Sequence, residues 1–256
     1  MPKAANVDLS IENQVARITI SDDKRMNLMN TPTMERIIAV GERLKRNAEV
    51  RLVILTGGGD KAFIGGADIT ELVTLNAETG PAFITKVHQV CHLFRALPVP
   101  TIARVNGFCL GAGMEVAASC DLRIGAEESS YGMPEVQLGV PSVVEAALLP
   151  TLIGWGNTRD ILYTGRVFSA EEARKMGFLQ KVTPRAELDA ALRDWIEPIL
   201  AADPLAVRAQ KRLIEGWLES GVAAGVQAGI DAFSRSFHSP APTERMRAFL
   251  DRPRNK

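Results

Sequence analysis

The chain has 256 residues, 46% of them hydrophobic, and its 30 Lys and Arg residues balance its 30 Asp and Glu residues. This length supports one large hydrophobic core, or one core with a small appendage. Zero net charge without a dense basic run argues against nucleic-acid binding, and no apolar run reaches the roughly 18 residues of a membrane span. The N-terminal segment resembles neither a signal nor a transit peptide, so we expect a soluble cytoplasmic protein.

The first elements alternate between strands and helices. Residues 7–20 alternate polar and apolar side chains and predict a pair of strands. Apolar side chains at helical spacing predict a helix over 31–45, with Thr31 as its N-cap and Pro32 at the first helical position. An apolar strand at 51–55 leads into a glycine turn. The pair Gly65-Gly66 then precedes a helical pattern that begins at Asp68.

The same order of elements returns further along the chain. A helix is predicted at 82–96, and the sequence TIARVN predicts a strand. The Gly-rich turn NGFCLGAG, the short apolar helix MEVAASC and the strand DLRIGA follow. The order strand, glycine turn, helix is a weak internal repeat, typical of helices stacked on a sheet. Further helices are predicted at 143–153, 157–164, 170–176, 186–202, 204–219, 222–236 and 242–250.

Two Gly-rich turns open helices, one at Gly65-Gly66-Ala67-Asp68 and one at Gly111-Ala112-Gly113. A helix N-terminus has unpaired N–H groups and a positive dipole end. Two such ends aimed at one point make an oxyanion hole for a carbonyl that gains negative charge. The alternative is that these glycines only make tight turns.

Two glutamates are candidates for acid–base chemistry. Glu115 lies early in a short, mostly apolar helix, where burial raises the pKa of a carboxyl group. The alternative is a first-turn glutamate that the helix dipole favours. Glu135 lies in a loop that contains Gly132 and Pro134, and the alternative there is an ordinary exposed loop residue.

Other signals are weaker. His88 and His92 are four residues apart, but a third metal ligand at matching spacing is missing, which favours an ordinary amphipathic helix. The sequence contains no P-loop, no GxSxG elbow and no GxGxxG after a strand. Three cysteines lie in apolar segments and indicate buried thiols in a reducing compartment: Cys91, Cys109 and Cys120.

Four segments in order resemble the crotonase superfamily of enoyl-CoA hydratases and isomerases: KAFIGGADITEL, ARVNGFCLGAGMEVAASCDLRIGAE, YGMPEVQLGV and YTGRVFSAEEARKMGFLQKV. The resemblance runs over nearly the whole chain. It implies an α/β fold, a crotonase-like spiral of ββα units with a C-terminal helical layer. Residues 1–200 are then the core with the active site, and residues 201–256 a helical region for oligomerisation and pocket cover.

The resemblance also implies roles for single residues. The backbone N–H groups of Ala67 and Ala112 are the expected oxyanion hole, and Glu115 and Glu135 the catalytic pair. It further implies a homotrimer or a dimer of trimers. No metal or separate cofactor is expected, since coenzyme A enters as part of an acyl-CoA substrate. The residues expected near CoA are Lys24, Met26, Leu28, Gly65, Asp68 and Ile69.

Two segments depart from the family pattern. Ser21-Asp22-Asp23-Lys24 stands where the family often has Asn-Arg-Pro-Lys, and GVPSVVEAALLP after Glu135 is about one residue shorter than in many hydratases. Glu145 therefore stands in an unexpected place, as a third acid in the pocket or a charge on a helix surface. We favour the surface charge.

The expected reaction is hydration of a 2-enoyl-CoA to the 3-hydroxyacyl-CoA, or the reverse dehydration. A double-bond isomerase of the same family is the nearest alternative, since some of these work with one carboxylate at the Glu135 position. Dehalogenases, hydrolases and decarboxylases of the superfamily typically place other residues at the two glutamate positions. Two alternatives come from other classes of protein. The mixed charge of the segment at 31–47 argues against an RNA-binding protein, and the presence of both glutamates argues against a non-catalytic acyl-CoA-binding subunit.

Overall fold

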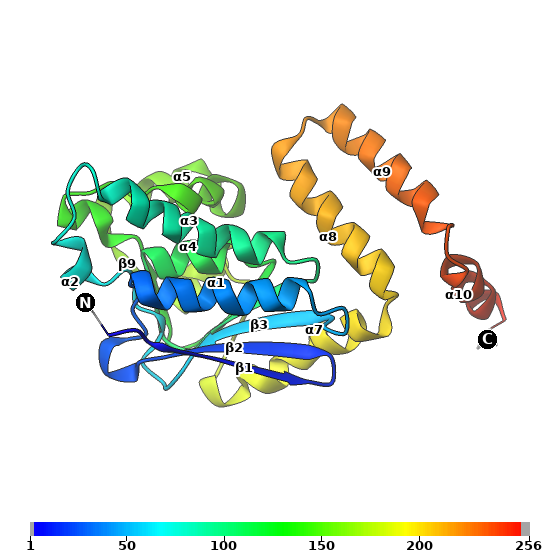
Figure 1. Ribbon diagram of the computed structural model, residues 1–256, viewed down its shortest axis with the longest axis horizontal. Helices are drawn as coiled ribbons and strands as arrows, with labels where there is room; N and C mark the ends of the chain where they lie inside the picture. Colours follow the sequence, from blue (N-terminus) through cyan, green and yellow to red (C-terminus); the bar gives the residue numbers. More distant parts are fainter. Residues whose placement is uncertain (1–2, 252–256) are drawn as a thin grey trace. The chain divides into compact units, whose positions relative to one another are not determined.

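The structure, a computed structural model, describes residues 3–251 (Figure 1). The chain divides into two compact units after Ile196. The first unit contains two sheets and the helices that cover them, and the second is helical.

The larger sheet has six strands in the order β1-β2-β3-β5-β7-β10. The strands are β1 (Asn6–Glu12), β2 (Val15–Ser21), β3 (Leu52–Gly57), β5 (Thr101–Val105), β7 (Leu122–Ala126) and β10 (Lys181–Thr183). β1 and β2 form the predicted antiparallel pair, and the other neighbours are parallel. β3 is buried along its whole length, which explains its continuous apolar run.

The smaller sheet has the order β4-β6-β8-β9, with β4 (Ala62–Ile64), β6 (Phe108–Leu110), β8 (Ser130–Gly132) and β9 (Val167–Ser169). β4, β6 and β8 are parallel. They follow β3, β5 and β7 in the chain, so each turn of the spiral contributes one strand to each sheet. This arrangement confirms the predicted spiral of ββα units.

Helices of the first unit are α1 (Thr31–Lys45), α2 (Ile69–Leu72), α3 (Gly80–Ala96), α4 (Ala112–Ala118), α5 (Leu149–Thr164) and α6 (Ala170–Met176), while α7 (Leu188–Ala201) continues into the second unit. Short 3-10 turns join them: η1 (Asp23–Arg25), η2 (Pro134–Leu138), η3 (Val144–Leu148) and η4 (Arg185–Glu187). α1 and α3 pack side by side on the sheet (Figure 1).

Two details of the predicted helices were wrong. The N-cap of α1 is Asn30, whose side chain accepts a hydrogen bond from the Thr33 N–H, and Thr31 is already helical. The helix predicted at 143–153 begins as the 3-10 turn η3. The predicted break before the helix at 157–164 is confirmed, since α5 is interrupted by a non-helical Gly154 with φ 76°. Gly154 accepts this conformation because it has no Cβ.

Every residue of α4 is buried. Its C-terminal carbonyl groups face Arg123, which is 3% exposed and donates to the carbonyl oxygens of Cys120 at 2.7 Å and Ala117 at 3.4 Å. The guanidinium also donates to the Phe178 carbonyl at 2.6 Å. The buried Arg123 cation thus donates hydrogen bonds at the negative end of the α4 dipole. This interaction stabilises both the cation and the helix.

The second unit contains α8 (Pro204–Glu219), α9 (Val222–Ser236) and α10 (Ala241–Leu250). Asp203 caps α8 by accepting from the Leu205 and Ala206 N–H groups. Large apolar side chains of these helices remain exposed, among them Val222, Phe233, Phe249 and Leu250. Within residues 3–251, none of the helices combines the length and apolar character that a membrane crossing requires.

Candidate active site

A cavity of about 330 Å³ in the first unit collects the residues expected to carry chemistry. Ala67, Ala112, Glu115 and Glu135 all line it. They come from three separate places in the chain: the loop after β4, the first turn of α4 and the turn η2. The spiral therefore brings together groups that the sequence separates by up to 68 residues.

One wall of the cavity is the N-terminus of α4. Gly111 precedes this helix with φ 50° and ψ −121°, a conformation that favours glycine. A Cβ at Gly111 would collide with the carboxylate of Glu135, so the missing side chain lets that carboxylate lie against the helix entrance. The Ala112 N–H is the first of the helix and therefore has no intrahelical partner.

A second wall is the segment 65–68. Met29 pairs with this segment by donating its N–H to the Gly66 carbonyl at 2.9 Å and accepting from the Asp68 N–H at 2.8 Å. That pairing skips the Ala67 N–H. Among the described residues, neither the Ala67 nor the Ala112 amide donates to a loop or turn carbonyl. Both amides are thus available to a ligand in the cavity.

Glu115 is only 4% exposed, as its apolar helix predicted. The Ala146 N–H donates to its Oε1 at 3.3 Å. Burial, together with the negative charges of Glu135 and Glu145, raises the pKa of Glu115 to about 8, although the Ala146 hydrogen bond opposes this. At neutral pH this carboxyl group therefore carries a proton.

Glu135 lies in η2 and is partly exposed toward the cavity. The Ser142 hydroxyl donates to its Oε2 at 2.7 Å. The sequence analysis did not single out Ser142, since a serine in a loop gives no signal of its contact before the loop is folded. After burial, the negative charge of Glu135 is the next largest cause of the raised pKa of Glu115.

The remaining walls are apolar. They come from the segment between α2 and α3, from α3 itself and from the loop after η2, and consist mainly of Leu72, Leu75, Phe83, Ile84, Val87, Leu138, Val140 and Val143. Glutamates and amides thus face a pocket that otherwise suits a hydrocarbon group.

The residues predicted to lie near CoA divide into two groups. Gly65 and Ile69 line the cavity, and Ile69 is 56% exposed. Lys24, Met26 and Leu28 lie outside the lining, although the Gly65 N–H donates to the Met26 carbonyl at 2.9 Å and so holds this loop beside the cavity. Their contacts with CoA stay predictions.

Asp68 stabilises the backbone around it. Its side chain is 1% exposed and accepts hydrogen bonds from the Thr70 backbone and hydroxyl and from Asn30. Burial opposes ionisation, but these hydrogen bonds outweigh it and hold the pKa of Asp68 below its usual range. This carboxylate caps α2 and orients the segment that presents Ala67.

The interpretation of Glu145 as a surface charge was wrong. This side chain is 4% exposed, and its Oε1 lies 2.8 Å from Nδ1 of His88 on α3. Its negative charge acts on Glu115. The error arose because η3 was treated as part of a regular amphipathic helix, in which residue 145 falls on the polar face.

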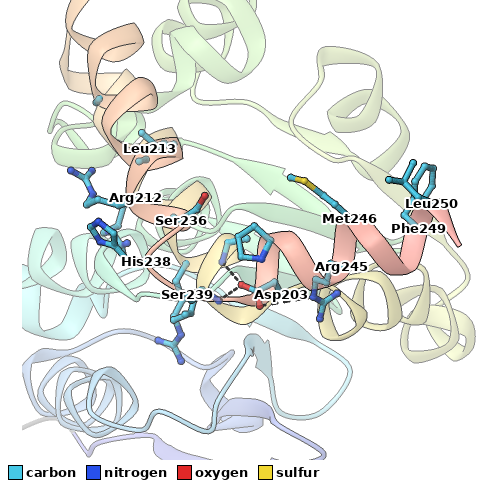
Figure 2. A pocket seen from close by; sticks show the side chains of 18 residues that line it. Asp203, Arg212, Leu213, Ser236, His238, Ser239, Arg245, Met246, Phe249 and Leu250 are labelled. Carbon is cyan, nitrogen blue, oxygen red and sulfur yellow. Dashed lines mark hydrogen bonds and ion pairs between the residues drawn. The ribbon is translucent and has the colours of Figure 1, made fainter.

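A larger hollow of about 1230 Å³ lies within the second unit between α8, α9 and α10. Figure 2 shows its mixed lining, with Met246, Phe249 and Leu250 on α10 and with Arg212 and His238 on the opposite side. It contains no paired carboxylates and no glycine turn at a helix start. We therefore place the chemistry in the smaller cavity.

Comparison with known proteins places the whole chain in a family. Residues 10–256 match the family model described as enoyl-CoA hydratase/isomerase. The chain is 33% identical to the short-chain-enoyl-CoA hydratase of Clostridium acetobutylicum and 35% identical to the crotonyl-CoA hydratase of Syntrophomonas wolfei; each alignment covers 96% of this chain and 95% of the relative. A crystal structure of an enoyl-CoA hydratase from Bacillus anthracis superimposes with a TM-score of 0.91 at 30% identity, covering 96% of both chains.

The chain therefore belongs to the enoyl-CoA hydratase/isomerase family. This confirms the family resemblance of the four sequence segments and the fold that it implied.

Proposed function

We propose that this protein hydrates a 2-enoyl-CoA thioester to the 3-hydroxyacyl-CoA and catalyses the reverse dehydration. The observation that carries the proposal is the cavity in which Glu115 and Glu135 share a site with the amides of Ala67 and Ala112. The names of the two relatives, a short-chain-enoyl-CoA hydratase and a crotonyl-CoA hydratase, support a short acyl group.

In this reaction the thioester oxygen accepts hydrogen bonds from the Ala67 and Ala112 N–H groups. Attack of water at C3 moves negative charge onto that oxygen, where the two donors stabilise it. Loss of one such donor costs about 3 kcal/mol of transition-state stabilisation in other enzymes. The α4 dipole acts in the same direction, because the positive end of that helix faces the cavity.

The two glutamates divide the proton transfers between them. We assign Glu135 to move the proton between water and C2, and Glu115 to orient and activate the water that reacts at C3. With the proton on Glu115, the pair is ready for dehydration: Glu135 takes the C2 proton and Glu115 protonates the departing hydroxide. Hydration starts from the form with the proton on Glu135, so one proton serves both directions. The reaction needs no redox step, and CoA enters with the substrate.

The first test is Glu135→Gln. The amide keeps the shape of the side chain but cannot exchange a proton, so kcat for hydration of crotonyl-CoA should fall by about 100-fold or more, while the substrate still binds in calorimetry. The exposed Glu128→Gln serves as the matched control and should retain activity. Unchanged turnover in Glu135→Gln contradicts the assignment.

Isomerisation of the double bond is the second candidate, because the matched family includes isomerases. An isomerase can shuttle one proton with Glu135 alone. Glu115→Gln separates the two: loss of hydration together with loss of all activity supports a hydratase, whereas full turnover of a 3-enoyl-CoA in this variant supports an isomerase. Assays over a series of straight, branched and aromatic enoyl-CoA esters define the acyl group.

The exposed apolar helices of the second unit also support self-association. Val222, Phe233 and Phe249 are each more than 60% exposed, which is unfavourable for a monomer in water. The assembly we propose is a homotrimer or a dimer of trimers, in which such faces are covered by other copies of the chain.

A further inference from the structure

Glu145 is a buried acid behind the cavity that the reaction described above leaves without a role. It does not line the cavity, yet it lies in η3, which packs against α4, α3 and α5. Its Oε1 contacts Nδ1 of His88 at 2.8 Å, and its buried Oε2 has no hydrogen-bond partner within residues 3–251. Burial of a carboxylate with one oxygen unpartnered is costly, so such a group calls for an explanation.

The backbone around Glu145 is held in an uncommon conformation. Val144 has φ 40°, a left-handed value that is unfavourable for a β-branched residue. This turn sends the next side chain, Glu145, inward, and places the following amide, Ala146 N–H, at 3.3 Å from Oε1 of Glu115. Strain of this kind concentrates at functional sites, where the surrounding contacts hold it in place.

His88 joins this arrangement to the surface. We assign the hydrogen of this contact to Nδ1 of His88, with Oε1 of Glu145 as the acceptor. The His88 side chain is 48% exposed, and its ring stacks on that of His92 one turn later in α3. The contact fixes η3 to α3 at the residue next to Ala146.

We infer that Glu145, fixed by His88, is a positioning residue for Glu115: it holds the Ala146 N–H against one oxygen of Glu115. This inference rests on the proposed function, because it assigns a role in the same proton transfers. Glu145 does not touch the substrate.

The titratable groups around Glu115 agree with this role. Glu135 approaches it from η2 and Glu145 from η3, and both negative charges raise the pKa of Glu115. From α3, the Cys91 thiol is fully buried; burial first, and then the charges of Glu145 and Glu115, raise the pKa of Cys91 well above its usual range. The thiol therefore stays neutral, and His88 is the group through which Glu145 reaches the surface.

The test is Glu145→Gln, which keeps the volume and the hydrogen-bond acceptor for His88 but removes the charge. We expect kcat for dehydration of the 3-hydroxyacyl-CoA to fall by about tenfold with little change in KM, and the alkaline limb of kcat/KM to move to lower pH by about one unit. A lower kcat with an unmoved alkaline limb reveals a merely structural role and overturns the inference. Activity within twofold of the wild type at every pH overturns it as well.

Two histidine variants test the contact from the other side. His88→Ala removes the donor to Glu145 and should lower kcat, whereas His88→Asn keeps a donor near the Nδ1 position and should restore part of the loss. Gln89→Ala, at an exposed position of the same helix, is the matched control and should behave as the wild type. Equal activity of the two His88 variants, or wild-type activity of His88→Ala, contradicts the role of this contact.

A titration of the Glu115 carboxyl group by ¹³C NMR separates this inference from the proposed function. In the free protein, Glu145→Gln should lower the pH at which Glu115 loses its proton, whatever the substrate. An unchanged titration overturns the inference even in an active hydratase. Absence of hydration by the wild type overturns the proposed function, and the titration still decides the role of Glu145.

Discussion

Glu115 keeps a proton at neutral pH because of three features of its surroundings. Burial in α4 removes most of the water that would stabilise its charge, and Glu135 and Glu145 add two negative charges nearby. The Ala146 N–H stabilises the ionised form only in part. One shared proton between two carboxyl groups is the arrangement that a reaction running in both directions needs.

This protonation predicts a specific pH dependence. Since the pKa of Glu115 is raised to about 8, the pair loses its shared proton as the pH rises through that value. Both carboxylates are then negative, and neither can protonate C2 or a leaving hydroxide. We therefore expect kcat/KM to decline above about pH 8, by about tenfold per pH unit, in assays at constant ionic strength. A flat profile up to pH 10 would contradict it.

At the scale of the elements, the N-terminus of α1 links the first strand to the site. Asn30 is fully buried; its Oδ1 accepts from the Thr33 N–H and hydroxyl, and its Nδ2 donates to Asp68 at 3.3 Å. A single amide thus caps α1 and orients the carboxylate that caps α2. The loop with Met29 and the segment with Ala67 are fastened to each other at this point.

We expect Asn30→Ala to lower the free energy of unfolding by about 2 kcal/mol, because it removes a helix cap and leaves buried partners without hydrogen bonds. Thr31→Ala, one residue later, is the matched control and should change stability by less than about 0.5 kcal/mol. Urea unfolding followed by circular dichroism measures both. A larger effect of Thr31→Ala would restore Thr31 as the cap.

Much of the element order was predictable because the longer elements carry clear periodicity. The strands β1, β2, β3, β5 and β7 and helices such as α1, α3 and α8 follow from apolar spacing. The strands of the smaller sheet do not, since β4, β6, β8 and β9 are each three residues long and too short for an alternating pattern. Because apolar spacing does not reveal these short strands, the ββα spiral was predicted from the family resemblance and not from the residue pattern.

The candidate site was likewise predictable only in part. Glu115, Glu135, Ala67 and Ala112 were singled out by the glycine turns and the family motifs, and the structure places all four around one cavity. Ser142 and Glu145 lie in a segment that departs from the family pattern and contains no regular helix at its start. Their contacts depend on backbone conformations, such as the positive φ of Val144, which residue types do not reveal.

At the scale of the molecule, the second unit leaves large apolar surfaces on α8, α9 and α10. We expect sedimentation velocity to show a species of three or six chains, since covering these faces is favourable by the hydrophobic effect. Phe233→Asp together with Phe249→Asp should shift the protein toward smaller species, whereas Arg43→Asp on α1 serves as a charge control. A wild-type monomer at micromolar concentration would contradict the proposed assembly.

The hydrogen bonds from Arg123 to the C-terminal end of α4 limit how the active site can evolve. One end of that buried helix presents the Ala112 amide and Glu115 to the cavity, and the other end is tied to a buried guanidinium. The amide and the acid therefore cannot be adjusted separately. The partly exposed turns η2 and η3 have no such constraint at most positions. Directed evolution toward new acyl groups should accumulate substitutions in those turns and leave α4 untouched.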